Sequence, residues 1–131
     1  MGENGQKSSP VVVVIEDHDI ARNMVVELLE GYKVFPFENG VRALDWLKAG
    51  SCGKIDLVIS DFDMPGPNGV EVLEEMKRSI PGVKTVLMSA TVLDDLEQIA
   101  KKHNFSGWLI KPFNSAQIDE MLEKVFSGKK A

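Results

Sequence analysis

Short apolar runs alternate with longer amphipathic segments along the middle of the chain. Val11–Ile15 is an unbroken β-branched run, too short for a helix and too apolar for a strand with one face in water. It therefore predicts a strand buried on both faces of a parallel sheet. The same pattern predicts strands at 55–60, 83–88 and 108–110, with a weaker candidate at Lys33–Phe37.

The segments that follow these strands carry apolar residues three and four positions apart, which is the spacing of one helix face. They predict helices at residues 20–30, 41–48, 70–79, 93–103 and 115–126. Asn39-Gly40 also fits a two-residue hairpin turn, but the helical spacing after it favours Asn39 as a helix cap. Because strand and helix alternate strictly, the pattern predicts an α/β fold with a doubly wound, five-stranded parallel sheet and helices on both faces.

Composition fits one ordinary globular domain. The chain has 131 residues, of which 44% are hydrophobic and 27% charged, enough for a single buried core. Residues 1–10 are polar and rich in Gly and Ser, which predicts a disordered N-terminal tail. The end of the chain, 128–131, is expected to be a C-terminal tail or a cut linker, so that the fold spans 11–127.

Charge and hydropathy argue against several classes of protein. The net charge of −5 argues against nucleic-acid binding by this domain, since phosphate backbones are bound by clustered lysine and arginine. No apolar run approaches the ~20 residues of a membrane span, and the N-terminus has no signal-peptide core, so we expect a cytoplasmic domain without membrane contact. Cys52 is the single cysteine and is interpreted as a passive thiol.

Polar residues stand at the carboxyl ends of the predicted strands, where doubly wound folds place their sites. Glu16 and Asp17 follow the first strand, Asp61 ends the third, Ser89 the fourth and Lys111 the fifth. Three carboxylates in one crevice repel one another and resist desolvation, and a hard divalent cation is the simplest compensation. Magnesium (Mg2+) suits the site because it prefers oxygen ligands and retains water.

A carboxylate held in such a site is a candidate nucleophile toward phosphorus, and its product is an aspartyl-phosphate. Phosphoryl transfer needs mainly in-line positioning and neutralisation of the equatorial oxygens. Mg2+ can hold one oxygen, the Lys111 ammonium a second, and the Ser89 hydroxyl or a loop amide the third. The sequence therefore predicts a phosphoacceptor site.

Four motifs in this order resemble the receiver domain of two-component response regulators, of the chemotaxis-regulator type: VVVVIEDHD, DFDMPGPNG, MSA and KPF. The resemblance runs from Val11 to Phe126 and implies a flavodoxin-like (βα)5 fold with strand order 2-1-3-4-5. It implies a signalling phosphoacceptor, not an enzyme, that takes a phosphoryl group from a histidine kinase or a histidine phosphotransfer protein. Its output would be a downstream protein target or a fused output domain.

The resemblance also implies roles for single residues. Asp61 would be the phosphoacceptor and a metal ligand, Asp17 a direct ligand and Glu16 a ligand through water. The backbone carbonyl of Asp63 would complete the metal shell, and Lys111 would contact the phosphoryl group. Glu16 stands where the family more often has Asp, and the Asp63 side chain adds charge where attacking water would approach.

The resemblance further implies a switch. Ser89 would move toward the phosphate, Trp108 would be the switch aromatic, and Pro112 would follow a cis peptide bond. The readout face would be the fourth helix, fifth strand and fifth helix. Trp108 as a simple core residue remains an alternative, since buried indoles usually only pack.

Two other functions compete with this interpretation. Asp61-Phe62-Asp63 is a DxD motif after a buried strand, as in haloacid-dehalogenase-type phosphatases, although theirs normally ends the first strand. A phosphorylation-independent pseudo-receiver is the second alternative, but the acidic residues and the lysine are all present here. His18 is interpreted as a surface residue and not as a metal ligand, because a hard oxygen site for Mg2+ does not call for imidazole.

Overall fold

Ten elements alternate strictly between strand and helix in a computed structural model of the chain. The strands are β2 (Val11–Ile15), β3 (Lys33–Phe37), β4 (Leu57–Asp61), β5 (Lys84–Ser89) and β6 (Gly107–Ile110), and the helices are α1 (Asp19–Leu28), α2 (Gly40–Lys48), α3 (Gly69–Ser79), α4 (Leu93–Lys102) and α5 (Ser115–Ser127). The structure describes residues 9–50, 53–90 and 93–127. Two predictions concern residues outside this range. The passive thiol was assigned to Cys52, and the tails include residues 1–8 and 128–131.

The five strands form one parallel sheet in the order β3-β2-β4-β5-β6. Counted along the chain this is the order 2-1-3-4-5, so the expected doubly wound, flavodoxin-like fold is confirmed. The register aligns Ile15 of β2 with Ser60 of β4, and Asp61 with Met88 of β5. The carboxyl ends of the central strands therefore meet at one edge of the sheet.

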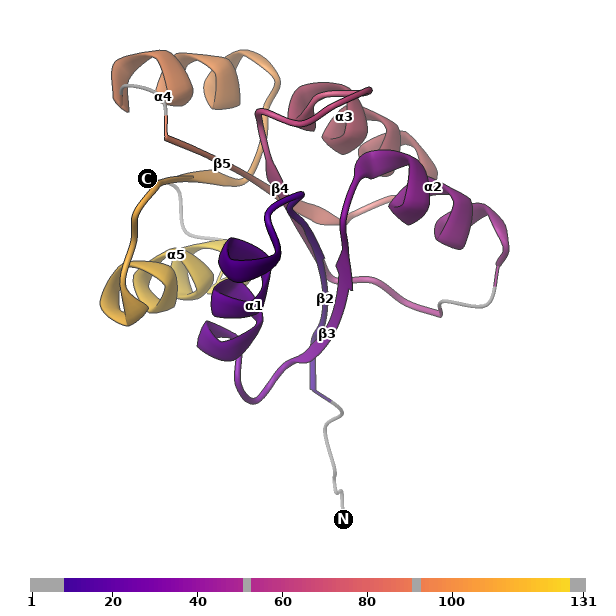
Figure 1. Cartoon of the computed structure of the whole chain (residues 1–131), viewed down its shortest axis with the longest axis horizontal. Coiled ribbons are helices and arrows are strands. Elements are labelled where there is room, and N and C mark those ends of the chain that lie inside the picture. The colour runs from indigo at the N-terminus through magenta and orange to yellow at the C-terminus, as the bar shows by residue number, and fades with distance from the viewer. Residues whose placement is uncertain (1–8, 51–52, 91–92, 128–131) are drawn as a thin grey trace.

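Helices cover both faces of the sheet, as Figure 1 shows. Helices α1 and α5 pack on one face, where Val25 and Ile118 join a core with the β2 residues Val12 and Val14. Helices α2, α3 and α4 pack on the other face, over Val13 and Ile15. All four of these β2 side chains are fully buried, as the unbroken apolar run predicts for a strand inside a parallel sheet.

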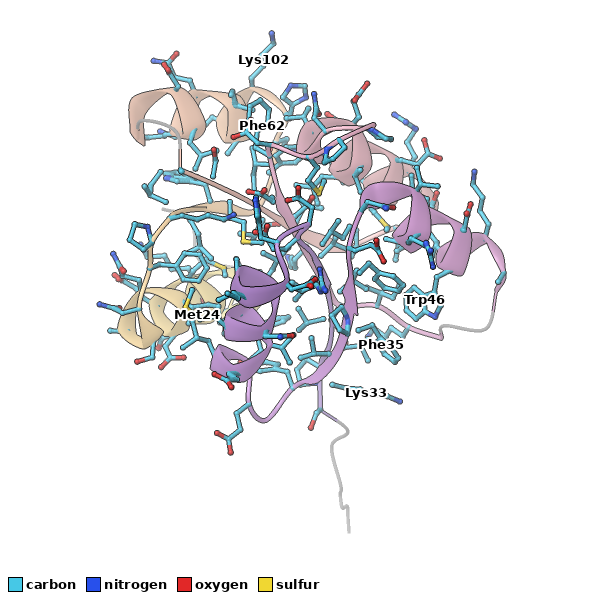
Figure 2. All side chains as sticks on the ribbon, in the orientation of Figure 1. Met24, Lys33, Phe35, Trp46, Phe62 and Lys102 are labelled. Carbon is cyan, nitrogen blue, oxygen red and sulfur yellow. The ribbon has the colours of Figure 1, made fainter. Side chains whose placement is uncertain are left out.

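The weakest strand candidate, β3, lies at the edge of the sheet. Pro36 interrupts its backbone donors, which an edge strand tolerates. Phe35 and Phe37 flank the Trp46 ring of α2, with ring centroids 4.9 and 5.1 Å away, and Figure 2 shows Phe35 beside Trp46. The indole of Trp46 thus supplies the packing that holds α2 against this edge strand.

The predicted helix cap at Asn39 is confirmed, because its side chain accepts a hydrogen bond from the backbone N–H of Arg42 at 2.8 Å. Two predicted boundaries were wrong by two residues. Helix α1 ends at Leu28, before Gly31 turns the chain with φ of 97°. Strand β4 begins at Leu57, and the Asp56 carboxylate just before it accepts the backbone N–H of Val11 at 2.8 Å.

None of the described helices combines the length and the apolar character that a bilayer span requires.

Candidate functional site

The polar residues predicted at the strand ends gather at the carboxyl edge of the sheet. Backbone hydrogen bonds continue past the strands and fix the loops there. The Glu16 N–H donates to the Phe37 carbonyl at 3.1 Å, and the Lys111 N–H donates to the Ser89 carbonyl at 2.8 Å. These bonds place Lys111 next to Ser89 and the first residue of the acidic pair beside β3.

Lys111 connects the ends of two strands. Its Nζ donates to Oε1 of Glu16 at 2.5 Å and lies 3.0 Å from Oδ1 of Asp61. The Glu16 side chain is 0% exposed, that of Asp61 5% and that of Lys111 22%, so the ammonium bridges two carboxylates largely away from water. The Lys111–Pro112 peptide bond is cis, which is the isomer that the resemblance to receiver domains implied.

The pKa values of Glu16, Asp61 and Lys111 are shifted from their usual values for different reasons. Burial raises the pKa of Asp61 to about 6, and the negative charges of Glu16 and Asp17 add to the rise, while Lys111 opposes it. Burial also acts to raise the pKa of Glu16, but hydrogen bonds from Lys111 and from the His18 backbone N–H lower it below its usual value. Burial acts to lower the pKa of Lys111, yet its two carboxylate partners hold it above normal. Of the three residues, Asp61 is therefore the one whose ionised form the folded protein disfavours.

Glu16, Asp17 and His18 form a group of potential metal ligands whose donor atoms lie within 4.8 Å of one another. Oδ1 of Asp17 is buried and accepts no hydrogen bond from the described residues. A buried carboxylate oxygen without a donor is costly unless a cation binds it, so the residues present fit a divalent metal ion. Asp61 lies outside this group of three and joins it through Lys111.

The other predicted site residues are placed as follows. Ser89 is fully buried at the end of β5, where it aligns with Ile110 of β6. Asp63 is exposed in the loop after β4. Trp108 is half-buried and packs against the core that includes Leu96 of α4. The structure thus brings the side chains of Glu16, Asp61 and Lys111 into contact through the Lys111 ammonium. Asp63 and Trp108 lie in neighbouring segments of the chain.

Gly69 starts α3 where the helix passes closest to the site. A Cβ at this position would lie 2.3 Å from the carbonyl oxygen of Asp61 and 2.9 Å from a methyl carbon of Leu87. Asn68 precedes it and accepts from the Glu71 N–H, while the Glu71 side chain accepts from the Asn68 N–H, which completes a capping box. Only glycine lets the capped helix approach the end of β4 this closely.

Two site residues were not predicted from the sequence. Arg22 of α1 donates to the carbonyl oxygen of Glu16 at 2.9 Å and pairs with Asp19 at 2.5 Å. The Asp19 to Arg22 spacing of three residues on a helix was a usable signal for the pair, but not for the contact with Glu16. His18 is exposed as expected, yet its Nδ1 lies 3.3 Å from both Glu16 and Asp17.

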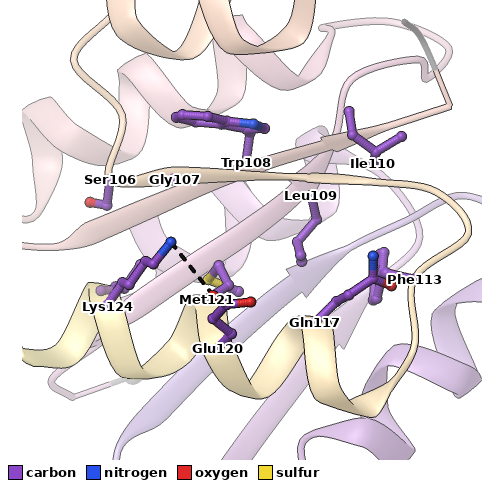
Figure 3. Close-up of a pocket in the computed structure, with 11 residues that line it drawn as sticks. Ser106, Gly107, Trp108, Leu109, Ile110, Phe113, Gln117, Glu120, Met121 and Lys124 are labelled. Carbon is purple, nitrogen blue, oxygen red and sulfur yellow. Dashed lines mark ion pairs between the residues drawn. The ribbon is translucent and has the colours of Figure 1, made fainter. Parts of the chain in front are cut away.

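A separate groove of about 270 Å³ lies between β6 and α5, and Glu16, Asp17 and Asp61 are not among the residues that line it. Figure 3 shows Trp108 and Leu109 extending to opposite sides of β6, with Leu109 toward Met121 of α5. Lys124 and Glu120 lie on its α5 side, with Nζ and Oε2 3.9 Å apart. The groove belongs to the expected readout face, since α5 and β6 form both of its walls.

Comparison with known proteins identifies related chains. Residues 12–123 match the family described as the response regulator receiver domain. A sensor kinase, CckA of Brucella abortus, is 33% identical over 122 residues, which are 88% of this chain and 13% of the kinase. The chain thus spans only a small part of that relative. Chemotaxis protein CheY-3 of Vibrio cholerae is 28% identical over 120 residues, which are 88% of this chain and 90% of that protein.

Solved structures agree with these matches. A response regulator from Thermotoga maritima superposes with a TM-score of 0.78 at 27% identity, covering 91% of this chain and 98% of the other. Chemotaxis protein CheY4 of Vibrio cholerae gives a TM-score of 0.78 at 26% identity, covering 90% of this chain and 99% of the other.

Proposed function

Because the chain belongs to the response regulator receiver domain family of two-component signalling, we propose that Asp61 accepts a phosphoryl group with the help of Mg2+. The observation that carries this proposal is the contact of one ammonium, Lys111 Nζ, with both Glu16 and Asp61. With Asp17 counted as well, three carboxylates are balanced by one ammonium at this edge of the sheet, so the excess charge matches a divalent cation.

Glu16, Asp17 and Asp61 would hold Mg2+ through their carboxylates, together with the backbone carbonyl of Asp63. When bound, Mg2+ supplies positive charge to oxygens of the phosphoryl group and to the acidic side chains. Oδ1 of Asp17 supports this assignment, because it is buried, accepts no hydrogen bond among the described residues and has the exposed His18 ring 3.3 Å away. Glu16 is engaged by Lys111 through Oε1, which is consistent with a ligand that acts through water.

Asp61 would attack the phosphorus of a phosphohistidine through a carboxylate oxygen. A P–O bond forms, the P–N bond breaks, and the bonding electron pair stays on the imidazole nitrogen, which takes a proton from solvent. Lys111 lies 3.0 Å from the Asp61 oxygen and can follow the charge as it passes to the phosphoryl oxygens. Ser89, buried at the adjacent strand end, would donate its hydroxyl to another of them.

The phosphodonor would be a histidine kinase or a histidine phosphotransfer protein. The similarity to part of a sensor kinase and to almost the whole of a chemotaxis protein supports this pairing. The same two relatives are consistent with either a fused output or a separate protein target. We place the receiver at residues 11–127, slightly beyond the matched 12–123.

The readout face would be α4, β6 and α5. Movement of Ser89 toward the phosphate would pull the following loop inward, and Trp108 would respond because it packs under α4. A partner that prefers the altered face shifts the equilibrium only by its differential affinity for the two forms. Trp108 is half-buried, so part of its indole is already open to solvent on this face.

Intact-mass measurement tests the proposal. The wild-type protein incubated with acetyl phosphate and Mg2+ should gain the mass of one phosphate, and the Asp61→Asn variant should gain none. Asp45→Asn is the matched control, because Asp45 is an exposed carboxylate on α2, and it should gain one phosphate as the wild type does. A wild-type protein that stays folded and never gains this mass would contradict the proposal.

A phosphatase would behave differently with a small phosphate ester. We expect no turnover of p-nitrophenyl phosphate, because Asp61 ends the third strand along the chain, whereas the DxD motif of haloacid-dehalogenase-type phosphatases normally ends the first. Multiple turnovers that disappear in Asp61→Asn would favour the phosphatase instead.

A further inference from the structure

We propose that His18 is a metal ligand and that, with Glu16 and Asp17, it makes this edge of the sheet bind a borderline transition-metal ion such as Zn2+ more tightly than Mg2+. The inference rests on the proposed function in taking the acidic pair as metal ligands. The His18 imidazole adds a nitrogen donor to the two carboxylates, and this nitrogen determines which metal the site prefers.

The geometry of the three donors suits a small tetrahedral ion. Nδ1 of His18 lies 3.3 Å from Oε2 of Glu16 and 3.3 Å from Oδ1 of Asp17. Ligand distances of about 2.1 Å in a tetrahedral zinc site separate neighbouring donor atoms by about 3.4 Å. The three donor atoms all lie within 4.8 Å of one another, so an ion among them would keep both His18 spacings and draw the two carboxylate oxygens toward each other.

Contacts with neighbouring residues orient the carboxylates of Glu16 and Asp17 toward this ion. Glu16 uses Oε1 for Lys111 and turns Oε2 toward His18, whose backbone N–H donates to it at 3.1 Å. Arg22 holds the carbonyl oxygen of Glu16, which fixes the loop that carries the pair. Oδ1 of Asp17 is buried without a hydrogen-bond partner among the described residues, so a cation would satisfy it.

The chemistry of the donors sets the preference. Mg2+ favours oxygen ligands and gains little from imidazole, whereas Zn2+ binds neutral imidazole together with carboxylates. The His18 side chain is 76% exposed, so the ion and its remaining water ligand can enter from solvent. Because both ions would use Asp17, Zn2+ and Mg2+ would exclude each other from this pair.

His103 provides a matched comparison, because the chain has two histidines. Its Nδ1 lies 2.7 Å from one carboxylate, that of Glu74, and the Lys77 ammonium donates to its backbone carbonyl at 2.8 Å. A single carboxylate beside a lysine is a poor metal site. Replacing His103 should therefore leave metal binding unchanged.

The test measures Zn2+ affinity against a chromophoric chelator, and Mg2+ affinity by the shift of the Asp17 amide in NMR spectra. The full chain is used with Cys52→Ser, which removes its one thiol. His18→Asn retains the backbone N–H and suits the position before α1. We expect it to weaken Zn2+ binding at least about tenfold while Mg2+ affinity changes less than twofold, a loss typical of removing a group that shapes a metal site. His103→Asn should change neither affinity.

A second readout identifies the liganding nitrogen. In ¹⁵N spectra of the histidine rings, Zn2+ should shift Nδ1 of His18 and leave His103 unaffected. Unchanged Zn2+ affinity in His18→Asn, or Zn2+ binding no tighter than Mg2+ in the parent protein, would overturn the inference. Failure of Mg2+ to bind the parent protein would count against the proposed function instead, since the Zn2+ comparison between variants can still be made.

Discussion

Lys111→Met is expected to slow the modification of Asp61 by acetyl phosphate at least about a hundredfold, a typical cost of removing one donor that stabilises developing charge. The ammonium lies 2.5 Å from Glu16 and 3.0 Å from Asp61, and methionine fills similar space without charge. The measurement is the rate of mass gain at fixed acetyl phosphate and saturating Mg2+.

Lys102→Met is the matched control for this change. Lys102 is exposed at the end of α4, and Figure 2 shows it pointing away from the body of the protein. The Lys102→Met variant should gain phosphate mass at the wild-type rate. Circular dichroism checks that Lys111→Met is folded, and a folded Lys111→Met protein that reacts within threefold of the wild-type rate would exclude a role for this ammonium in the transfer.

Asp61→Asn is expected to stabilise the metal-free protein by up to about 3 kcal/mol at pH 7.5. Burial raises the pKa of Asp61 from 3.8 to about 6, so ionisation of the folded protein is disfavoured by this amount. Asparagine has nearly the same shape as the protonated acid and carries no charge. The measurement is urea unfolding in the presence of a chelator.

The pH dependence has a definite sign. Because the pKa of folded Asp61 lies above that of the unfolded chain, the wild type loses stability relative to Asp61→Asn as pH rises from about 4 to about 6. Above this range the difference is constant, and at pH 4.5 it should shrink to about 1 kcal/mol. A variant no more stable than the wild type at pH 7.5 would show that ionised Asp61 carries no such cost.

The fold was predictable because its signals are local. The β-branched run Val11–Ile15 occupies β2 with the same bounds in the structure. Asn39 caps α2 as its position before a helical pattern indicated. The two boundaries that were wrong lie beside non-local or turn contacts. The Asp56 carboxylate accepts the first backbone N–H of β2, and Gly31 follows α1 with a positive φ. The spacing of apolar residues along the sequence carries no signal for either contact.

The meeting of Glu16, Asp61 and Lys111 followed from topology, because parallel strands bring their carboxyl ends to one edge. The sequence did not show which oxygen Lys111 contacts, because that depends on side-chain rotamers in a packed site. It also did not show that His18, although exposed, turns its ring back to the acidic pair. Contacts of this kind are set by loop conformation, which has no periodic signal.

Chemical location of the modification shows whether Asp61 carries the phosphoryl group. Borohydride converts an aspartyl-phosphate to homoserine, so protein treated with acetyl phosphate and Mg2+ and then reduced should carry homoserine at position 61 in peptide mass spectra. Homoserine at another aspartate, or phosphate retained on a serine or histidine with Asp61 unchanged, would show that Asp61 is not the phosphoacceptor.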